Sequence, residues 1–215
     1  MRNENYFCNR ILGRMKNILI INGAIKFAHS GGGFNGALVE WTSEIANELG
    51  FNVQIVNVQD EFDSNEEVEK FKWADAVIYH TPIWWFHVPN RFKYYLDEVL
   101  TVGHNNGMYK SDGRSHVNPS INYGTGGLMQ GKFYMLTSTW NAPEEAFTLE
   151  GEFFKQTSVD DGVLFGFHRM NDFLGLTKME GFHFYDLEKN GTPERIEAYK
   201  NNYKAHLKTQ LINKL

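Results

Sequence analysis

A short strand, a glycine-rich loop and a helix, in that order, form the feature that most constrains this sequence. The aliphatic run at residues 17–21 predicts a strand over residues 16–23 that is buried on both faces of a parallel sheet. Glycines then crowd the loop at residues 31–33. Four apolar residues recur at helical spacing before Gly50 ends the helix: Leu38, Trp41, Ile45 and Leu49.

This arrangement is typical of a site that binds a phosphate group. Glycines let backbone N–H groups approach an anion, the Ser30 hydroxyl can donate to it, and the helix N-terminus carries partial positive charge. The sequence therefore predicts a nucleotide-type cofactor, with an ordinary surface loop as the alternative. No Lys-Ser or Lys-Thr opens the helix, which excludes a P-loop. Gly23 is separated from Gly31 by seven residues, so the dinucleotide fingerprint also fails.

Composition indicates one compact domain without the charge of a nucleic-acid binder. The 215 residues are 42% hydrophobic and 15% aromatic, and the net charge is −5 with no long basic run. Cys8 is the single cysteine and no apolar run is long enough for a membrane span, so we expect a cytoplasmic protein. Residues 1–14 differ in composition from the rest of the chain, and we expect an accessory arm there and one domain over residues 15–215.

Strands and helices alternate along the rest of the chain. Further strands are predicted at residues 53–58, 76–80, 132–138 and 178–185, with the first of these at a sheet edge. Helices are predicted at 66–73, from an Asn90 cap, through 165–174 from a capping box at 158–161, and from Thr192-Pro193 to Leu211. The alternation predicts an α/β, flavodoxin-like, doubly wound five-stranded parallel sheet of order 2-1-3-4-5 with helices on both faces.

Three unusual loops should meet at the carboxyl ends of the first, third and fourth strands. They are the glycine loop, the proline-bracketed aromatic run at 82–89, and Thr139-Trp140-Asn141. A phosphate site beside tryptophans suits a cofactor with a flat ring, such as a flavin. The alternative is that Trp84, Trp85 and Phe86 fill the core. His80, His87, His104 and His116 have no helical pairing or carboxylate partner at ligand spacing, so no metal site is expected.

Seven groups of residues, in one order across residues 15–210, resemble the modulator-of-drug-activity-B branch of the NAD(P)H:quinone oxidoreductases. They are Ile20-Ile21-Asn22-Gly23-Ala24, Phe27-Ala28-His29-Ser30, Trp73-Ala74-Asp75, Pro82-x-Trp84-Trp85, Ser111-Asp112-Gly113-Arg114, Tyr123-Gly124-x-Gly126-Gly127-Leu128-x-Gln130-Gly131-Lys132 and Thr139-Trp140-Asn141-Ala142-Pro143-x-Glu145-Ala146-Phe147. The resemblance implies a flavodoxin-like homodimer that binds FAD and passes two electrons from NADPH or NADH to quinones.

The resemblance also implies a set of cofactor-binding residues. The pyrophosphate region would contact His29, Ser30, Gly31, Gly32, Gly33, Phe34, Asn35, Gly36 and Ala37, although relatives often have a hydroxyl residue where this chain has Ala37. The ring would be lined by Pro82, Ile83, Trp84, Trp85 and Phe86, and covered at its polar edge by Thr139, Trp140, Asn141 and Ala142. Tyr123 would contact the flavin from the glycine-rich segment. With a lost hydrogen bond at Ala37, FMN stays open beside FAD.

The expected reaction is a ping-pong hydride transfer, in which the nicotinamide and a quinone use the same ring face in turn. Tyr123 and Trp140 are the candidate catalytic residues, and backbone donors at 139–141 would lie near the ring's polar edge. Arg114 or Lys110 would favour NADPH if either lies near its 2′-phosphate. The alternatives are an FMN-dependent azo or nitro reductase and a non-enzymatic electron carrier of the flavodoxin type.

The segment at residues 103–131 is rich in Gly, Asn, Ser and Asp and too long for a simple connection. It contains Met108 and Tyr109, and Phe147, Phe153, Phe154 and residues 165–167 add more aromatic surface than one sheet of this size can easily bury. We expect these segments at the carboxyl edge of the sheet, beside the cofactor. The sequence therefore predicts an obligate homodimer whose subunits complete each other's sites.

Overall fold

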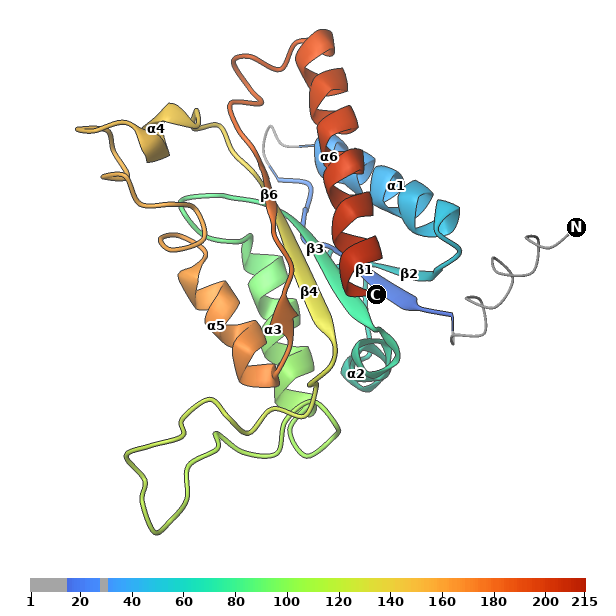
Figure 1. Cartoon of the computed structure of the whole chain (residues 1–215), viewed down its shortest axis with the longest axis vertical. Helices are drawn as coiled ribbons and strands as arrows, with labels where there is room; N and C mark the ends of the chain where they lie inside the picture. Colours follow the sequence, from blue (N-terminus) through green and yellow to red (C-terminus); the bar gives the residue numbers. More distant parts are fainter. Residues whose placement is uncertain (1–14, 28–30) are drawn as a thin grey trace, which may run out of the picture.

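The computed structural model describes residues 15–27 and 31–215, so the predicted arm at 1–14 lies outside the described residues (Figure 1). The strands are β1 (Asn17–Asn22), β2 (Asn52–Asn57), β3 (Ala76–Pro82), β4 (Phe133–Thr139), β5 (Thr177–Lys178) and β6 (Phe182–Phe184). The helices are α1 (Gly33–Glu48), α2 (Ser64–Trp73), α3 (Asn90–Val102), α4 (Glu145–Thr148), α5 (Phe165–Leu174) and α6 (Pro193–Lys214).

The sheet is parallel and has the predicted order, β2-β1-β3-β4-β5. The aliphatic strands β1 and β3 lie in the middle, whereas β2, whose polar residues alternate with apolar ones, forms an edge. Central strands of this kind are buried on both faces, which is why they are almost continuously apolar. The predicted flavodoxin-like, doubly wound fold is confirmed.

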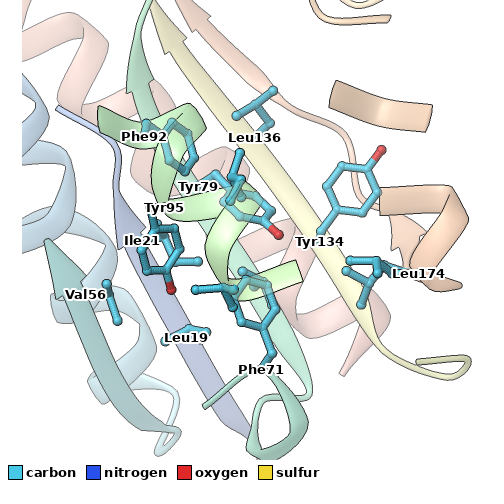
Figure 2. Close-up of a cluster of buried hydrophobic side chains, with 14 of the residues drawn as sticks. Leu19, Ile21, Val56, Phe71, Tyr79, Phe92, Tyr95, Tyr134, Leu136 and Leu174 are labelled. Carbon is cyan, nitrogen blue, oxygen red and sulfur yellow. The ribbon is translucent and has the colours of Figure 1, made fainter. Parts of the chain in front are cut away.

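Helices cover both faces of the sheet (Figure 1). On one face, α1 and α6 pack against Ile18, Ile20 and Ile78. On the other face, α2, α3 and α5 enclose a second core rich in aromatic side chains, including Phe71, Tyr79 and others seen in Figure 2. Burying large rings of this kind contributes roughly 1.5–3 kcal/mol per side chain to folding. These two cores hold the strand ends, and therefore the loops at the carboxyl edge, in fixed positions.

The predicted last strand is interrupted, so the sheet contains six strand segments rather than five. Lys178 pairs with Tyr134 and Phe182 pairs with Thr137, so the outer chain advances four residues while β4 advances three. The extra residue forms a bulge that separates β5 from β6. A Cβ on Gly181 would lie 2.6 Å from the carbonyl oxygen of Leu136, so a larger residue there would collide with β4.

Three of the predicted helix starts are wrong. The helix predicted from residue 66, α2, begins at Ser64 because Asp63 caps it. Pro89 occupies the N-cap of α3 and Asn90 is the first helical residue. The Asn90 side chain accepts from the adjacent N–H of Arg91 and does not cap the helix. Ser158 accepts from the N–H of Asp161 within a separate turn, while α5 begins later, at Phe165 after Leu164. Thr192 does cap α6 as predicted, since its hydroxyl accepts from the N–H of Arg195.

The long segment at residues 103–131 lies at the amino edge of the sheet. The prediction that placed it at the carboxyl edge, beside the cofactor, is wrong. The segment links the end of α3 to the start of β4, so the chain topology puts it at the amino ends of the strands. Figure 1 shows it extending from the molecule at the end opposite to α4. The N–H of Met129 donates to the carbonyl of Leu174, which ties the segment to the end of α5.

Candidate functional site

A cavity of about 720 Å³ opens at the carboxyl edge of the sheet. It brings together the three predicted loops, which follow β1, β3 and β4, and adds a fourth after β6. Its lining consists of Phe27, Gly31, Gly32, Gly33, Phe34, Asn35, Pro82, Ile83, Trp84, Trp85, Phe86, Thr139, Trp140, Asn141, Ala142, Leu187 and Glu188. The volume falls in the range of small-molecule and cofactor sites.

The glycine loop turns the chain sharply into the N-terminus of α1. Gly32 occupies the N-cap with φ of 71°, a left-handed conformation that glycine adopts without strain. Apart from the neighbouring backbone, a Cβ on Gly31 or Gly33 would meet no atom of the described residues within 4 Å, so the backbone here has room for a ligand. No acidic residue stands in the first turn of α1, which leaves the partial positive charge of the helix end available to an anion.

The predicted phosphate-binding set is only partly brought together in the cavity. His29 and Ser30 lie outside the described residues. Within the described part of the chain, Gly36 and Ala37 are not among the cavity-lining residues. The N–H of Gly36 donates to the carbonyl of Gly32, and Ala37 packs against the core on the α1 side of the sheet. Ala37 therefore lies against the core rather than in the cavity wall.

Asn35 is a buried polar side chain in the cavity wall with one unsatisfied atom. It is 4% exposed, its Nδ2 donates to Thr139 Oγ1 over a long 3.4 Å, and its Oδ1 has no hydrogen-bond partner among the described residues. An unpaired buried oxygen costs roughly 1–3 kcal/mol of stability. Its position between the glycine loop and the end of β4 suits a polar ligand group that would pair with it.

The aromatic loop after β3 forms a tight turn rather than core filling. Trp84 and His87 exchange both backbone hydrogen bonds, at 2.9 and 3.0 Å, and the turn residues Trp85 and Phe86 have φ of 48° and 65°. Such values are uncommon for bulky side chains and mark functional turns more often than packing turns. Trp85 is 91% exposed, so the core-filling interpretation is wrong for it. Phe27 packs its ring on Trp84 at 5.4 Å.

The loop after β4 supplies the opposite wall. Trp140 is 5% exposed, and its backbone N–H donates to the carbonyl of Phe184 at 2.8 Å. That N–H belongs to the sheet, so the expectation of backbone donors from residues 139–141 at the ring edge is wrong for Trp140. Asn141 Nδ2 donates to the carboxylate of Glu188, and both residues line the cavity.

Phe27, Leu187 and Glu188 line the cavity but were not among the predicted site residues. A signal for the last two was present, because they follow the final strand and carboxyl ends of parallel strands share one edge. The prediction had included only the first, third and fourth strands. For Phe27 the signal was its place in the motif Phe27-Ala28-His29-Ser30, in the loop after the first strand that the sequence already places at the site.

Tyr123 lies away from the cavity of its own chain. It is 71% exposed on the 103–131 segment, with its ring 6.0 Å from Phe173 at the end of α5. Arg114 lies 5.6 Å from the Tyr123 ring and forms an ion pair with Asp112 at 2.6 Å. Lys110 belongs to the same segment, where its carbonyl accepts from His104 Nε2. A single chain therefore does not join Tyr123, Arg114 or Lys110 to the cavity.

The histidines considered for metal binding do not come together. His80 is fully buried between Thr42 Oγ1 at 3.0 Å and Thr137 Oγ1 at 2.7 Å, and burial lowers its pKa to about 3. In the described part of the chain, no group of three or more His, Cys, Asp or Glu side chains is placed to hold a metal ion. The same residues include no helix long and apolar enough to cross a membrane.

Comparison with known proteins agrees with this geometry. A family model described as the flavodoxin-like fold matches residues 16–207. The chain is 48% identical over 192 residues to the NADPH:quinone oxidoreductase MdaB of Haemophilus influenzae, covering 89% of this chain and 97% of that protein. It is also 44% identical to an uncharacterised protein of Schizosaccharomyces pombe, covering 88% of this chain and 94% of the relative.

Solved structures share the fold at lower sequence identity. A candidate quinone reductase from Klebsiella pneumoniae has a TM-score of 0.67 and 24% identity, covering 92% of this chain and 84% of that one. An FMN-dependent NADH-azoreductase from Bacillus anthracis, in complex with FMN, has a TM-score of 0.65 and 14% identity, covering 92% and 99% of the two chains. At these identities the likeness concerns the fold alone.

Proposed function

Since this chain belongs to the MdaB branch of the NAD(P)H:quinone oxidoreductases, within the flavodoxin-like family, we propose that it reduces quinones with FAD as its cofactor. The observation that carries the proposal is one cavity bounded by a helix N-terminus on one side and an aromatic turn on the other. A phosphate suits the first boundary and a flat ring suits the second.

The described residues fit a flavin. Gly31 to Gly33, at the N-terminus of α1, would hold the phosphates, and the unpaired Oδ1 of Asn35 would accept from a ligand hydroxyl. The ring would lie between the Pro82–Phe86 turn and the Thr139–Ala142 loop. When bound, the flavin supplies reversible two-electron chemistry, while the protein supplies position and electrostatics.

The chain's own residues would orient flat reactants at the mouth of the cavity. Trp84, Trp85 and Phe27 form an aromatic rim at the mouth of the cavity, and their exposed faces suit both a nicotinamide and a quinone. One rim for two reactants favours binding in turn, which is the ping-pong order. A flat, electron-poor acceptor fits better than a bulky one, because the walls are ring faces rather than a round pocket.

We further propose that the active form is a homodimer in which Tyr123 acts on the partner's cavity. Tyr123 is exposed at the amino edge of its own sheet, so a second copy is required to bring its phenol to a ring site. Phe153, which is 70% exposed and stacks on Phe86 at 5.5 Å, offers apolar surface beside the cavity. Phe154 instead packs against Phe147, with ring centroids 3.9 Å apart, within the chain.

The decisive experiment identifies the released cofactor by mass and measures NADPH oxidation with a soluble quinone. The matched variants are Gly33→Val and Gly36→Val, because both residues stand in the first turn of α1 with open space around their Cβ positions and only Gly33 lines the cavity. Gly33→Val should lose flavin and turnover while Gly36→Val retains both. Full flavin in Gly33→Val would contradict the phosphate assignment.

The same measurement separates the alternatives. FMN of equal stoichiometry, with azo or nitro compounds reduced faster than quinones, would favour the azoreductase function, which the fold of the FMN-bound Bacillus anthracis enzyme also supports. Bound flavin that ignores NADPH and NADH would favour an electron carrier. A monomer that turns over quinone at micromolar concentration would contradict the shared site.

A further inference from the structure

A chain of hydrogen bonds runs from the cavity wall to a half-buried carboxylate on the α5 side of the sheet. Trp140 Nε1 donates to Ser138 Oγ at 2.7 Å, and Ser138 Oγ lies 2.7 Å from His183 Nδ1. The other ring nitrogen, His183 Nε2, lies 3.3 Å from Asp160 Oδ1. Ser138 and His183 are paired residues of the neighbouring strands β4 and β6.

Every donor in this series of hydrogen bonds, from Trp140 to Asp160, has an acceptor. Because Ser138 Oγ accepts from the indole, its hydroxyl hydrogen is free to point at His183 Nδ1, which leaves the hydrogen of His183 on Nε2, facing Asp160. Asp160 also accepts from His168 Nε2 at 2.9 Å and from Lys178 Nζ at 2.5 Å. Burial acts to raise the pKa of Asp160, but the hydrogen bonds from His168, His183 and Lys178 outweigh it and hold that pKa well below its usual range.

Ser, His and Asp in this order resemble a hydrolytic triad, but a nucleophilic role for Ser138 is excluded. Ser138 is fully buried, and its oxygen already holds the indole N–H of Trp140. No substrate carbonyl can therefore approach its oxygen in this conformation. What the chain does reach is the cavity, because Trp140 is the member that lines it.

We propose that Ser138, His183 and Asp160 are positioning residues that fix the orientation of the Trp140 indole in the ring site, an inference that rests on the proposed function of that site. The ring contacts of Trp140 are edge-on, with Phe147 at 5.0 Å and Phe154 at 6.0 Å. Edge-on ring contacts of this kind do not by themselves fix the rotation of the indole about its side-chain bonds. Its N–H bond to Ser138 is directional, and His183 and Asp160 orient the hydroxyl that receives it.

A readout that needs no flavin tests the coupling directly. In the apoprotein, ¹⁵N spectra resolve the indole N–H signals, and Trp140→Phe identifies the one from Trp140. The expectation is that Ser138→Ala and His183→Gln both move that signal. His168→Gln is the matched control, because it removes the ring nitrogen that bonds Tyr134, on the branch of the network that leads away from Trp140.

Turnover tests the consequence for the ring site. Ser138→Ala should lower kcat/KM for a quinone about three- to tenfold at unchanged flavin content, as expected for one lost hydrogen bond. In a Trp140→Phe background, which lacks the indole N–H, the same Ser138 change should have almost no further effect. His168→Gln should leave kcat/KM unchanged.

The outcomes are distinguishable from a failure of the proposed function. If His183→Gln leaves the indole signal where it was while the enzyme turns over quinone normally, the positioning role is wrong and the reductase stands. If the indole signal moves but no flavin or turnover is found, the network holds and the ring-site function is wrong.

Additive losses for Ser138→Ala and Trp140→Phe would overturn the proposal, because they would show independent effects. His183→Leu, which removes both ring nitrogens, replaces His183→Gln if that variant fails to fold, and it should move the indole signal in the same way.

Discussion

Two hydrogen-bond networks, one on each face of the sheet, start from neighbouring buried residues of β4. Thr137 faces α1 and α6, where it joins His80, Thr42 and Tyr203. Ser138 faces the opposite side, where it joins His183 and Asp160. Side chains alternate along a strand, so one step along β4 changes which network a hydroxyl serves.

The networks differ in charge, and this difference separates their roles. The first contains a neutral histidine between two hydroxyls, and burial without a charged partner lowers its pKa to about 3. The second contains an ionised carboxylate held by two histidines and Lys178. The neutral network is buried in the core and holds the packed side chains in place. The charged network ends at the cavity wall, so it can also orient the Trp140 indole there.

Removing the charge from the second network should have the largest effect on stability. Asp160→Asn keeps the shape but turns one acceptor oxygen into a donor that faces Lys178 or a histidine. We expect a loss of about 3 kcal/mol in the free energy of unfolding at neutral pH, because Lys178 and the two histidines lose their common charged partner. Urea denaturation measures this. Asp161→Asn, at the exposed next residue, should cost less than about 1 kcal/mol.

A loss for Asp160→Asn no larger than for Asp161→Asn would show that Asp160 is solvated in solution and that the two networks do not differ as described.

Acid should weaken the neutral network first. The pKa of His80 falls from 6.5 to about 3 on folding, so below pH 6.5 the unfolded chain binds a proton that the folded chain does not bind. Stability contributed by His80 is therefore lost as the pH falls, by about 2 kcal/mol between pH 7 and pH 5 at 1.36 kcal/mol per unit. The pKa of Asp160 is also depressed, but its contribution is lost only below its ordinary value near 4.

Urea denaturation at pH 7 and pH 5 tests this order. His80→Gln should reduce the difference in unfolding free energy between the two pH values by about 2 kcal/mol, because the variant has no imidazole to protonate. An unchanged pH dependence in His80→Gln would mean that His80 is protonated in the folded state.

The sequence predicted the strands of the sheet better than the elements that depend on contacts between distant segments. The aliphatic runs of β1 and β3 identify central strands, because a strand buried on both faces must be almost continuously apolar. The division between β5 and β6 depends instead on the carbonyl of Leu136 standing opposite Gly181. The start of α5 likewise depends on a turn at Ser158 that does not continue into the helix.

The site was predictable where it followed from topology. Glycine, aromatic and Thr139 loops converge because carboxyl ends of parallel strands share an edge. The place of Tyr123 was not predictable from its motif, since the long segment returns to the amino edge before β4 begins. The link from Trp140 to Asp160 joins residues from three separate segments, and no spacing in the sequence indicates it.

A smaller effect is expected from removing one hydroxyl of the neutral network. Thr42→Val keeps the shape of the side chain but leaves His80 Nε2 and the Tyr203 hydroxyl without their shared partner. We expect a loss of about 1–2 kcal/mol in unfolding free energy, with quinone turnover unchanged at saturating flavin. Thermal unfolding and steady-state kinetics measure the two. Reduced turnover in a stable Thr42→Val protein would mean that this network also reaches the site.

The sharpest test of the difference between the two networks removes, in separate variants, two hydroxyls that are one residue apart on β4. Thr137→Val and Ser138→Ala each remove one buried hydroxyl from β4, and each should cost about 1 kcal/mol of stability. Their effects on the cavity should differ, because Thr137 hydrogen-bonds His80 whereas Ser138 accepts from Trp140. Only Ser138→Ala should shift the Trp140 indole signal in ¹⁵N spectra. A shift of equal size in Thr137→Val would mean that the sheet transmits strain between its faces, and that charge does not distinguish the two networks.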